Sequence, residues 1–337
     1  MRYGVVGTGY WGSNHVRVAD ELAREGIIDE VVVCDVDEDR ARTLAEGFDR
    51  PYTTSYAEMD VDAATVATPS TTHEGIATDL LESGVDLLVE KPLALTAEAA
   101  YDIVETADEN DRTLGVGHIF RYHPALKDLK RRIDAGELGE IRYLHTARFS
   151  FRLPRPTTGV LYQLAVHDVD VYAYLLGETP ERIYCNRDSF VRERIDETAT
   201  LTMDYGDKTG VIHSSWQVPV FGKRRDLAVV GSKRAAYVDY LADTEVELYD
   251  TRVVREDGEL WTRENGRTVH EVPDAEPLRQ ELEAFLGAAH AGKTPPASGR
   301  VGARTISLLE RAIDADNRNQ VVDVDRRRPR RQSVRQD

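Results

Sequence analysis

The chain has 337 residues, of which 41% are hydrophobic and 31% are charged. This length and composition predict a globular protein of two domains and exclude a fibrous or disordered chain. No apolar run is long enough to cross a membrane. The two cysteines, Cys34 and Cys185, lie far apart and lack the spacing of a zinc site or a disulfide framework. We therefore expect no metal, no membrane partner and a reducing, cytoplasmic location.

The formal net charge is −17, although residues 326–337 contain six arginines and a single aspartate. The rest of the chain is therefore more acidic still, and we expect no nucleic-acid partner for the folded part, because duplex binding requires a basic surface. Only seven of the 43 basic residues are lysine. Together with the excess of acid, this composition is typical of a salt-adapted, halophilic protein.

Short apolar strands alternate with helical patterns in the first 120 residues. The chain opens directly on a strand, so we expect no targeting peptide. Strands are predicted at residues 3–6, 31–34, 63–67, 86–89 and 114–117, with helices at 38–46, 73–82 and 97–109 and a further helix after the first strand. This alternation predicts a parallel, doubly wound sheet.

The pattern changes after residue 121. Helices are predicted at residues 124–135, 160–176, 277–291 and 301–315, and strands at 141–151, 198–205, 211–217, 226–230, 235–240 and 246–249. Consecutive strands joined by tight turns indicate a mostly antiparallel open sheet. We predict an α/β chain with a first domain at 1–120, an α+β domain at 121–325 and a basic disordered tail at 326–337.

A glycine motif follows the first strand. Gly7, Gly9 and Gly12 match GxGxxG at the entrance to the first helix, where the glycines allow a tight turn, close approach of a pyrophosphate and close packing of helix on strand. The alternative is a glycine turn with no dinucleotide. Tyr10 and Trp11, inside the motif, either stack on cofactor or substrate or cover the helix end.

Asp35 ends the second predicted strand, 23 residues after Gly12. A carboxylate at this place binds the ribose hydroxyls of a dinucleotide and repels a 2′-phosphate, so the motif predicts a Rossmann domain that prefers NAD. Arg40 and Arg42 lie close by and keep NADP open, because arginine accommodates the additional phosphate.

Six later motifs resemble the glucose–fructose oxidoreductase/inositol dehydrogenase/MocA (Gfo/Idh/MocA) family of sugar dehydrogenases. They read ATPSTTH at 67–73, VEKP at 89–92, FRYHP at 120–124, GELG at 136–139, HDVD at 167–170 and EPLRQELEAF at 276–285. The resemblance covers roughly residues 2–320 and implies a Rossmann domain and an α+β domain, with NAD(P) and substrate meeting between them. It also assigns cofactor contacts to Thr68, Pro69, His73, Glu90 and Lys91.

Oxidation of a sugar alcohol requires a hydride acceptor, a base, and a donor that holds the hydroxyl oxygen. The resemblance implies that Lys91 touches the reacting hydroxyl while Glu90 positions the nicotinamide. His167 is the candidate base, because imidazole titrates near neutral pH. The family usually has an aspartate four residues before this histidine, but this chain has Gln163, which cannot take a proton. Gln163 either orients His167 or binds substrate hydroxyls.

Polar residues around the predicted helix at 160–176 provide further candidates. Gln163, His167, Asp170 and Tyr174 form one helical stripe, which either lines a pocket or faces solvent. With the resemblance, we expect Arg121, Tyr122, Gln163 and Asp170 to bind substrate beside Lys91. Arg148, Arg152 and Arg155 either bind a phosphate or carboxylate of the substrate or form an ion-paired face.

These residues predict an NAD(P)-dependent oxidoreductase that oxidises a ring hydroxyl of a sugar. The opening GTGYWGSNHVR looks most like branches of the family that act on nucleotide sugars, so UDP-N-acetylglucosamine or its uronate, oxidised at C3, is the first expected substrate. A myo-inositol or free-sugar dehydrogenase and a non-catalytic module that binds NAD and sugar are the alternatives. The open sheet predicts a homodimer or homotetramer.

Overall fold

A computed structural model of the chain describes residues 1–220, 222–242 and 244–324, so the predicted basic tail lies outside the described residues. The chain divides into two compact units. The first contains Met1–Ile119 and Glu276–Ser307, and the second contains Phe120–Ala275 and the described residues from Leu308 onward.

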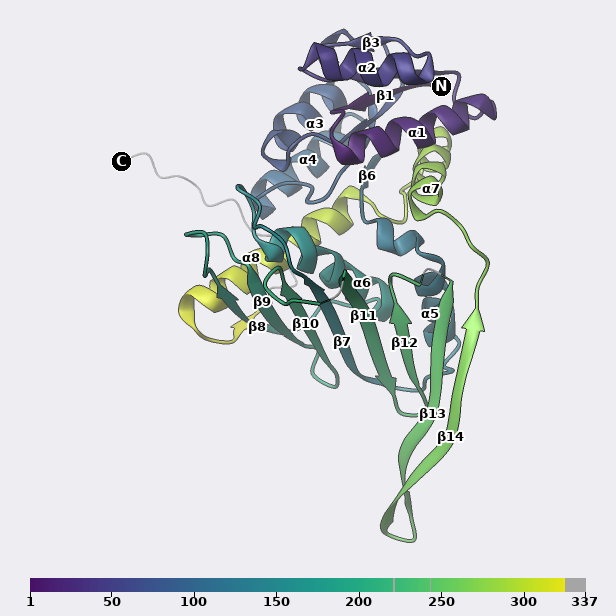
Figure 1. Cartoon of the computed structure of the whole chain (residues 1–337), viewed down its shortest axis with the longest axis vertical. Coiled ribbons are helices and arrows are strands. Elements are labelled where there is room, and N and C mark those ends of the chain that lie inside the picture. Colours follow the sequence, from purple (N-terminus) through teal and green to yellow (C-terminus); the bar gives the residue numbers. More distant parts are fainter. Residues whose placement is uncertain (221, 243, 325–337) are drawn as a thin grey trace. The chain divides into compact units, whose positions relative to one another are not determined.

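The first unit is built on a six-stranded parallel sheet (Figure 1). The strand order is β3-β2-β1-β4-β5-β6, which is the order of dinucleotide-binding folds. The strands are β1 (Arg2–Val6), β2 (Glu30–Cys34), β3 (Tyr52–Thr53), β4 (Ala63–Val66), β5 (Asp86–Val89) and β6 (Leu114–Val116). The central strands read as short apolar runs because helices cover both faces of such a sheet. The predicted doubly wound domain is therefore confirmed.

The helices in the amino-terminal part of this unit differ in how they begin, because only some of them have a side-chain cap. They are α1 (Tyr10–Arg24), α2 (Glu38–Phe48), α3 (His73–Glu82) and α4 (Ala97–Glu109), with single 3₁₀ turns at Tyr56–Glu58 and Ser70–Thr72. The side chain of Asp37 accepts a hydrogen bond from the Arg40 amide at the start of α2, and Thr96 does the same for the Ala99 amide of α4.

A late helix completes the core of the first unit. Helix α7 (Pro277–Ala291) places Leu282, Phe285 and Leu286 in one apolar cluster with side chains of β1 and α1. The domain predicted at 121–325 assigned this helix to the second unit, and the structure corrects that assignment. The amphipathic pattern predicted the helix, but it contained no signal for which sheet the apolar face would cover.

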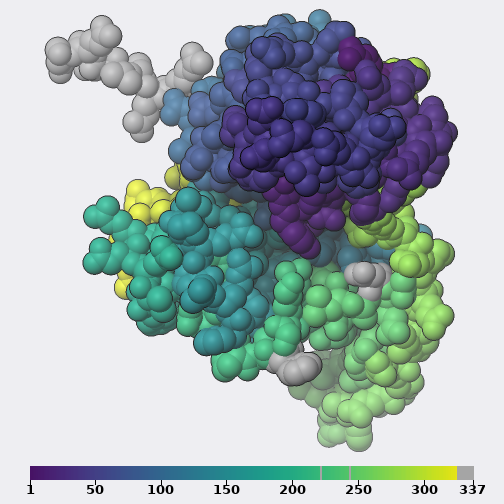
Figure 2. Space-filling view, turned by 45° about the horizontal axis from the view of Figure 1, so that its top comes forward, coloured from purple at the N-terminus to yellow at the C-terminus, as the bar shows by residue number. Residues whose placement is uncertain are grey.

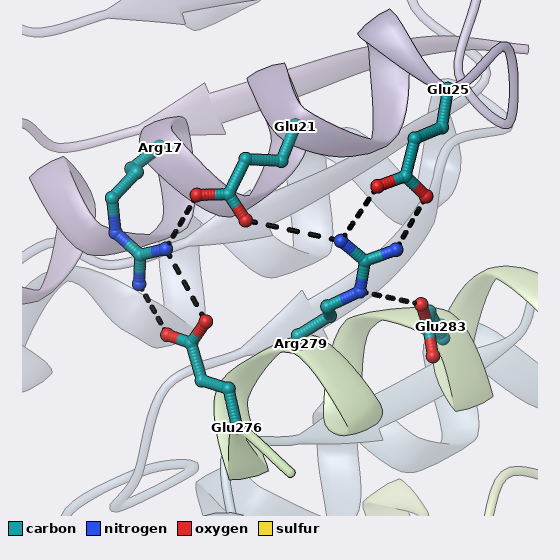
Figure 3. Close-up of polar contacts among 6 residues, drawn as sticks. All are labelled: Arg17, Glu21, Glu25, Glu276, Arg279 and Glu283. Atoms are coloured by element: carbon teal, nitrogen blue, oxygen red, sulfur yellow. Dashed lines mark hydrogen bonds and ion pairs between the residues drawn. The ribbon is translucent and has the colours of Figure 1, made fainter.

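Ion pairs join the same two helices along their polar edges (Figure 3). Arg279 of α7 pairs with Glu25 at the end of α1 at 2.5 Å, and Arg17 of α1 pairs with Glu276. Within the helices, Arg17 also pairs with Glu21, and Arg279 with Glu283. The contact between α1 and α7 is therefore apolar at its centre and charged at its edge.

The second unit contains a nine-stranded open sheet in the order β14-β13-β12-β11-β7-β10-β9-β8-β15. The strands are β7 (Ile141–Ser150), β8 (Arg182–Asp188), β9 (Thr198–Asp204), β10 (Thr209–Ser215), β11 (Lys223–Gly231), β12 (Ala235–Asp239), β13 (Glu245–Glu256), β14 (Glu259–Glu271) and β15 (Val322–Asp323). Among the described strands of this sheet, only β7 and β10 pair in parallel, and the other neighbours are antiparallel. The predicted mostly antiparallel sheet is confirmed.

Helices α5 (Pro124–Asp134) and α6 (Val166–Leu176) lie on one face of this sheet (Figure 1). Helix α8 (Gly299–Arg318) begins in the first unit and ends in the second, where Asp316 binds the Arg187 guanidinium of β8. The chain enters α6 through a π-helical turn at Leu161–Ala165, where the sequence predicted one continuous α-helix from residue 160. Wide turns of this kind are frequent at functional sites.

Strands β13 and β14 form a long hairpin whose outer end projects beyond the rest of the sheet (Figures 1 and 2). The sequence predicted only residues 246–249 of β13 and none of β14. Almost every side chain of β14 is exposed, so the strand lacks the alternation of buried and exposed positions on which prediction depends. No helix in the described ranges is long and apolar enough to cross a membrane.

Candidate functional site

The glycine loop between β1 and α1 has two positions at which any side chain would clash with the protein backbone. Gly7 has φ +94°, and a Cβ there would lie 2.9 Å from the backbone of Ala67 and Thr68. A Cβ on Gly12 would lie 1.7 Å from the Gly7 carbonyl oxygen. Gly9 differs, because a Cβ there would meet nothing within 4 Å. The space over Gly9 is open, as the approach of a pyrophosphate requires.

Asp35 follows β2 and is buried beside the same loop. Its Oδ2 accepts hydrogen bonds from the Thr8 amide at 2.7 Å and the Thr8 hydroxyl at 2.8 Å, and its Oδ1 accepts one from the Asp37 amide at 2.9 Å. Burial favours the neutral acid, but these bonds and the charge of Arg40 outweigh it and lower the pKa of Asp35. The group is therefore an ionised carboxylate, and Oδ1 retains capacity for a further donor.

Arg40 and Arg42, which left NADP open in the sequence, both contact carboxylates. Arg40 donates to Asp37 at 2.9 Å and lies 3.7 Å from Asp35, and Arg42 pairs with Asp39. A 2′-phosphate would compete with these carboxylates for the guanidinium groups. This arrangement favours NAD.

The two aromatic residues of the loop lie at the surface. The side chain of Tyr10 is 80% exposed and that of Trp11 is 39% exposed, with their ring centroids 5.7 Å apart. Neither ring covers the helix end as a buried cap, so both remain accessible to a ligand.

The loop after β4 contains Thr68 and Pro69, and the side chain of His73 holds it in place. The His73 ring is buried, with Nδ1 2.9 Å from the Pro92 carbonyl oxygen and Nε2 2.9 Å from the Thr68 carbonyl oxygen. Burial lowers the pKa of His73. The sequence predicted a cofactor contact for this residue, whereas its polar atoms bind two backbone loops of the protein.

Glu90, at the end of β5, belongs to a polar chain inside the first unit. Its Oε1 lies 3.1 Å from Nε2 of His15, and its Oε2 accepts the Lys91 amide at 3.1 Å. Burial raises the pKa of Glu90, but the hydrogen bond from His15 and the charges of His15 and Lys91 outweigh it, and the net shift is downward. Lys91 is half-buried directly after this strand, at the carboxyl end of the parallel sheet, where ligands of such folds bind.

His15 is the residue of this group that the sequence did not single out. It lies on α1 with no exposed surface, and on the far side Thr65 Oγ1 is 3.5 Å from its Nδ1. Its position three residues after Gly12, on the buried side of the helix, was a usable signal.

In the second unit, Gln163 and His167 lie in different helical elements and so do not form the regular α-helical stripe that the sequence predicted. Gln163 lies in the π-helical turn and donates from Nε2 to Thr158 Oγ1 at 2.5 Å, while His167 lies in α6. The His167 ring packs edge-on against Phe120, with ring centroids 5.0 Å apart. The side chain of Gln163 thus anchors the loop before the π turn.

Arg121 and Asp170, both predicted to bind substrate, bind each other. Arg121 donates from Nε to both carboxylate oxygens of Asp170 at 3.0 and 2.9 Å and from a terminal nitrogen to Oδ1 at 2.7 Å. Asp170 is buried, and the guanidinium lies 5.3 Å from the Tyr174 ring centroid. Tyr122 is also buried. These contacts join α6 to the start of the unit.

A second buried ion pair joins α6 to β7. Arg148 of β7 donates from Nε to Asp168 of α6 at 2.6 Å, and both side chains are inaccessible. The guanidinium carbon lies 4.4 Å from the Phe120 ring centroid and 4.7 Å from that of Tyr240. Burial raises the pKa of Asp168, against the opposing effect of Arg148. Among the described residues, no group of three or more His, Cys, Asp or Glu side chains is placed to hold a metal ion.

Comparison with known proteins identifies both parts of the chain. Residues 1–118 match the model of an oxidoreductase family with an NAD-binding Rossmann fold, and residues 126–237 match the C-terminal domain model of the same family, Gfo/IDH/MocA. The chain belongs to the Gfo/Idh/MocA oxidoreductase family. It is therefore an NAD-binding oxidoreductase, as the motifs predicted.

Relatives within the Gfo/Idh/MocA family match along most of the chain. UDP-N-acetylglucosamine 3-dehydrogenase of Acidithiobacillus ferrooxidans is 29% identical over 311 residues, covering 91% of this chain and 94% of the relative. Myo-inositol 2-dehydrogenase of Thermotoga maritima is 27% identical over 330 residues, covering 91% and 94%. The solved structure of the first relative superposes with a TM-score of 0.80 at 27% identity, over 94% of this chain and 97% of that one.

A second solved structure supports the fold alone. Levoglucosan dehydrogenase in complex with NADH superposes with a TM-score of 0.83, covering 96% of this chain and 99% of that chain, but is only 17% identical.

Proposed function

We propose that this protein is an NAD-dependent dehydrogenase that oxidises a ring hydroxyl of a nucleotide sugar, with UDP-N-acetylglucosamine at C3 as the first substrate to test. The observation that carries the proposal is the match along nearly the whole chain to UDP-N-acetylglucosamine 3-dehydrogenase, at 29% identity. The inositol dehydrogenase match is almost as extensive, so myo-inositol is the second substrate to test.

The residues of the first unit fit a bound dinucleotide. Gly9 leaves room for the pyrophosphate, the α1 amides lie behind it, and the ionised Asp35 accepts from a ribose hydroxyl through Oδ1. His73 holds the loop of Thr68 and Pro69 in place through the Thr68 and Pro92 carbonyl groups. NAD, when bound, supplies the acceptor for the hydride of the carbinol carbon.

Two side chains carry the remaining chemistry in this proposal. The Lys91 ammonium donates a hydrogen bond to the reacting hydroxyl oxygen. The Glu90 carboxylate accepts a hydrogen bond from the Lys91 amide and so holds the backbone of this residue. His167 accepts the hydroxyl proton, since a neutral imidazole nitrogen is a suitable general base. Gln163 cannot share that proton, so it shapes the turn before α6 through Thr158.

The decisive experiment follows NADH formation with UDP-N-acetylglucosamine, its uronate, myo-inositol and glucose, in concentrated KCl. We expect turnover with a nucleotide sugar. Lys91→Ala should lower kcat by about 100-fold or more, as loss of an acid–base or oxyanion donor does, while NAD affinity stays nearly unchanged. Unaltered rates in this variant would reject the mechanism.

A non-catalytic module that binds NAD and sugar is the second candidate, because Gln163 replaces the aspartate of the family pattern. NAD binding without oxidation of any sugar in the panel would favour that module. A Gln163→Asp variant separates the two, since gain of turnover only in the variant would assign the defect to this position.

A further inference from the structure

Three arginines gather on the helix-covered face of the second-unit sheet. Arg148 of β7 is opposite Arg225 of β11 in the antiparallel ladder, so both side chains leave the same face. Arg152 follows β7, and its guanidinium carbon lies 5.1 Å from the ring centroid of the buried Trp216. Arg152 is exposed and Arg225 is half-buried. The group therefore extends from the interior to the surface.

The charges of this group are not balanced within the protein. Arg148 is paired with Asp168, but neither Arg152 nor Arg225 forms an ion pair with any residue in the described ranges. Burial, followed by the charges of Arg148 and Arg152, lowers the pKa of Arg225, with Asp168 opposing them. Three positive charges thus face one carboxylate, in a chain whose net charge is −17.

The buried polar atoms around the group include unpartnered donors, together with one acceptor, Oδ1 of Asp168, that also lacks a hydrogen-bond partner among the described residues. One terminal nitrogen of Arg148 and the hydroxyl of Ser214, which is its partner on β10, are buried and have no hydrogen-bond partner in the described part of the chain. Asp226, the next residue of β11, does not compensate, because it points to the other face and pairs with Arg224. An anion bound by Arg152 and Arg225 would offset this local excess of positive charge.

Phe120 connects this group to the proposed base. Its ring contacts the Arg148 guanidinium on one side, at 4.4 Å, and the His167 ring, at 5.0 Å. All of these residues belong to the second unit. A ligand held by Arg152 and Arg225 would therefore lie near the residue that accepts the substrate proton.

We propose that Arg152 and Arg225 bind an anionic group of the substrate, a carboxylate or phosphate, and that Arg148 supports them from the interior. The inference rests on the proposed function and deepens it by selecting anionic sugars over neutral ones. Guanidinium groups bind both kinds of oxyanion through paired hydrogen bonds. Arg148 is a positioning residue, since its own hydrogen bond goes to Asp168.

The test compares full-length Arg152→Gln and Arg225→Gln with Arg224→Gln. Arg224 is the matched control, because it precedes Arg225 on the same strand, faces the other side and is 54% exposed. Kinetics are measured with UDP-N-acetylglucosamine and glucuronate as anionic substrates and with N-acetylglucosamine and myo-inositol as neutral ones, at a fixed KCl concentration. Thermal unfolding confirms that each variant is folded.

We expect the two test variants to raise KM for anionic substrates about 10- to 100-fold, as loss of a charge-assisted hydrogen bond does, with kcat and neutral substrates little changed. An effect on the UDP-sugar alone identifies a phosphate as the bound group, and an effect on glucuronate alone identifies a carboxylate. Equal losses with neutral and anionic substrates, or no change in KM, would overturn the inference.

Failure of the proposed function is distinguishable from failure of this inference. If no sugar is oxidised, calorimetry with UDP and with glucuronate still measures the site directly. Binding to the wild-type chain and to Arg224→Gln, with loss in Arg152→Gln and Arg225→Gln, would sustain the anion site without the reaction. Absence of binding to the wild-type chain would refute it.

Discussion

At the residue scale, Gly9 and Gly12 differ in what an added methyl group would meet. A Cβ at Gly12 collides with the Gly7 carbonyl, whereas a Cβ at Gly9 enters open space. We expect Gly12→Ala to lower the free energy of unfolding by about 1–3 kcal/mol or more, as overpacking does. Gly9→Ala should leave stability unchanged and weaken NAD binding. Urea unfolding and NAD titration measure the two effects, and loss of stability in Gly9→Ala would contradict the assignment.

Glu90 gives a pH prediction. Its pKa lies below the usual 4.5 in the folded protein, so its ionised form contributes stability above about pH 4.5, and that contribution is lost as the pH falls through the lowered value. Glu90→Gln cannot ionise and leaves His15 with a weaker partner. We expect the variant to be about 1–3 kcal/mol less stable at pH 7, with the difference shrinking below pH 4.5. Urea unfolding of both proteins across this pH range tests the prediction. A stability difference that does not change with pH would refute it.

The sequence located the candidate site better than it described its contacts. The motifs placed Gly7, Asp35 and Lys91 at strand ends, because the carboxyl ends of parallel strands share one edge of a sheet. They did not show that His73 binds two backbone carbonyls or that Arg121 pairs with Asp170. Such pairings depend on side chains far apart in the chain, and a single sequence contains no local signal for them.

At the element scale, α7 makes the core of the first unit depend on residues from the end of the chain. Phe285 is buried in the cluster with β1 and α1. We expect Phe285→Ala to destabilise the first unit by about 3–5 kcal/mol. Hydrogen exchange should then quicken in β1 and α1. Val253→Ala, in the exposed hairpin, is the control and should change little; equal protection of β1 in both variants would contradict the packing.

The strands that prediction found and missed differ in burial. The parallel strands of the first unit are short apolar runs, and all of them except the two-residue β3 were predicted. Strand β8 was missed although Ile183 and Cys185 alternate with exposed residues, so its signal was present. The π turn at Leu161–Ala165 could not be predicted from the sequence, because its hydrophobic pattern over five residues does not differ from that of an α-helix.

At the scale of the whole molecule, the homodimer or homotetramer that we predicted from the open sheet remains a prediction. Tyr143 of β7 is 38% exposed and its ring stacks on that of His145, which in turn contacts the His213 ring, on the face opposite Leu144. We expect sedimentation in concentrated KCl to give a mass above that of one chain, and Tyr143→Glu to shift it toward the monomer. Tyr52→Glu, equally exposed in the first unit, should not. A monomeric mass for the wild-type protein would contradict this prediction.

The position of α7 in the chain also has a consequence for protein synthesis. When Met1–Ile119 has left the ribosome, the surface that α7 will cover is still exposed, and roughly 150 further residues must be translated before the helix appears. At ~5–20 residues per second, that wait lasts about eight to thirty seconds. The nascent amino-terminal segment would spend this interval with an apolar patch open to solvent, which makes it a natural client for a chaperone.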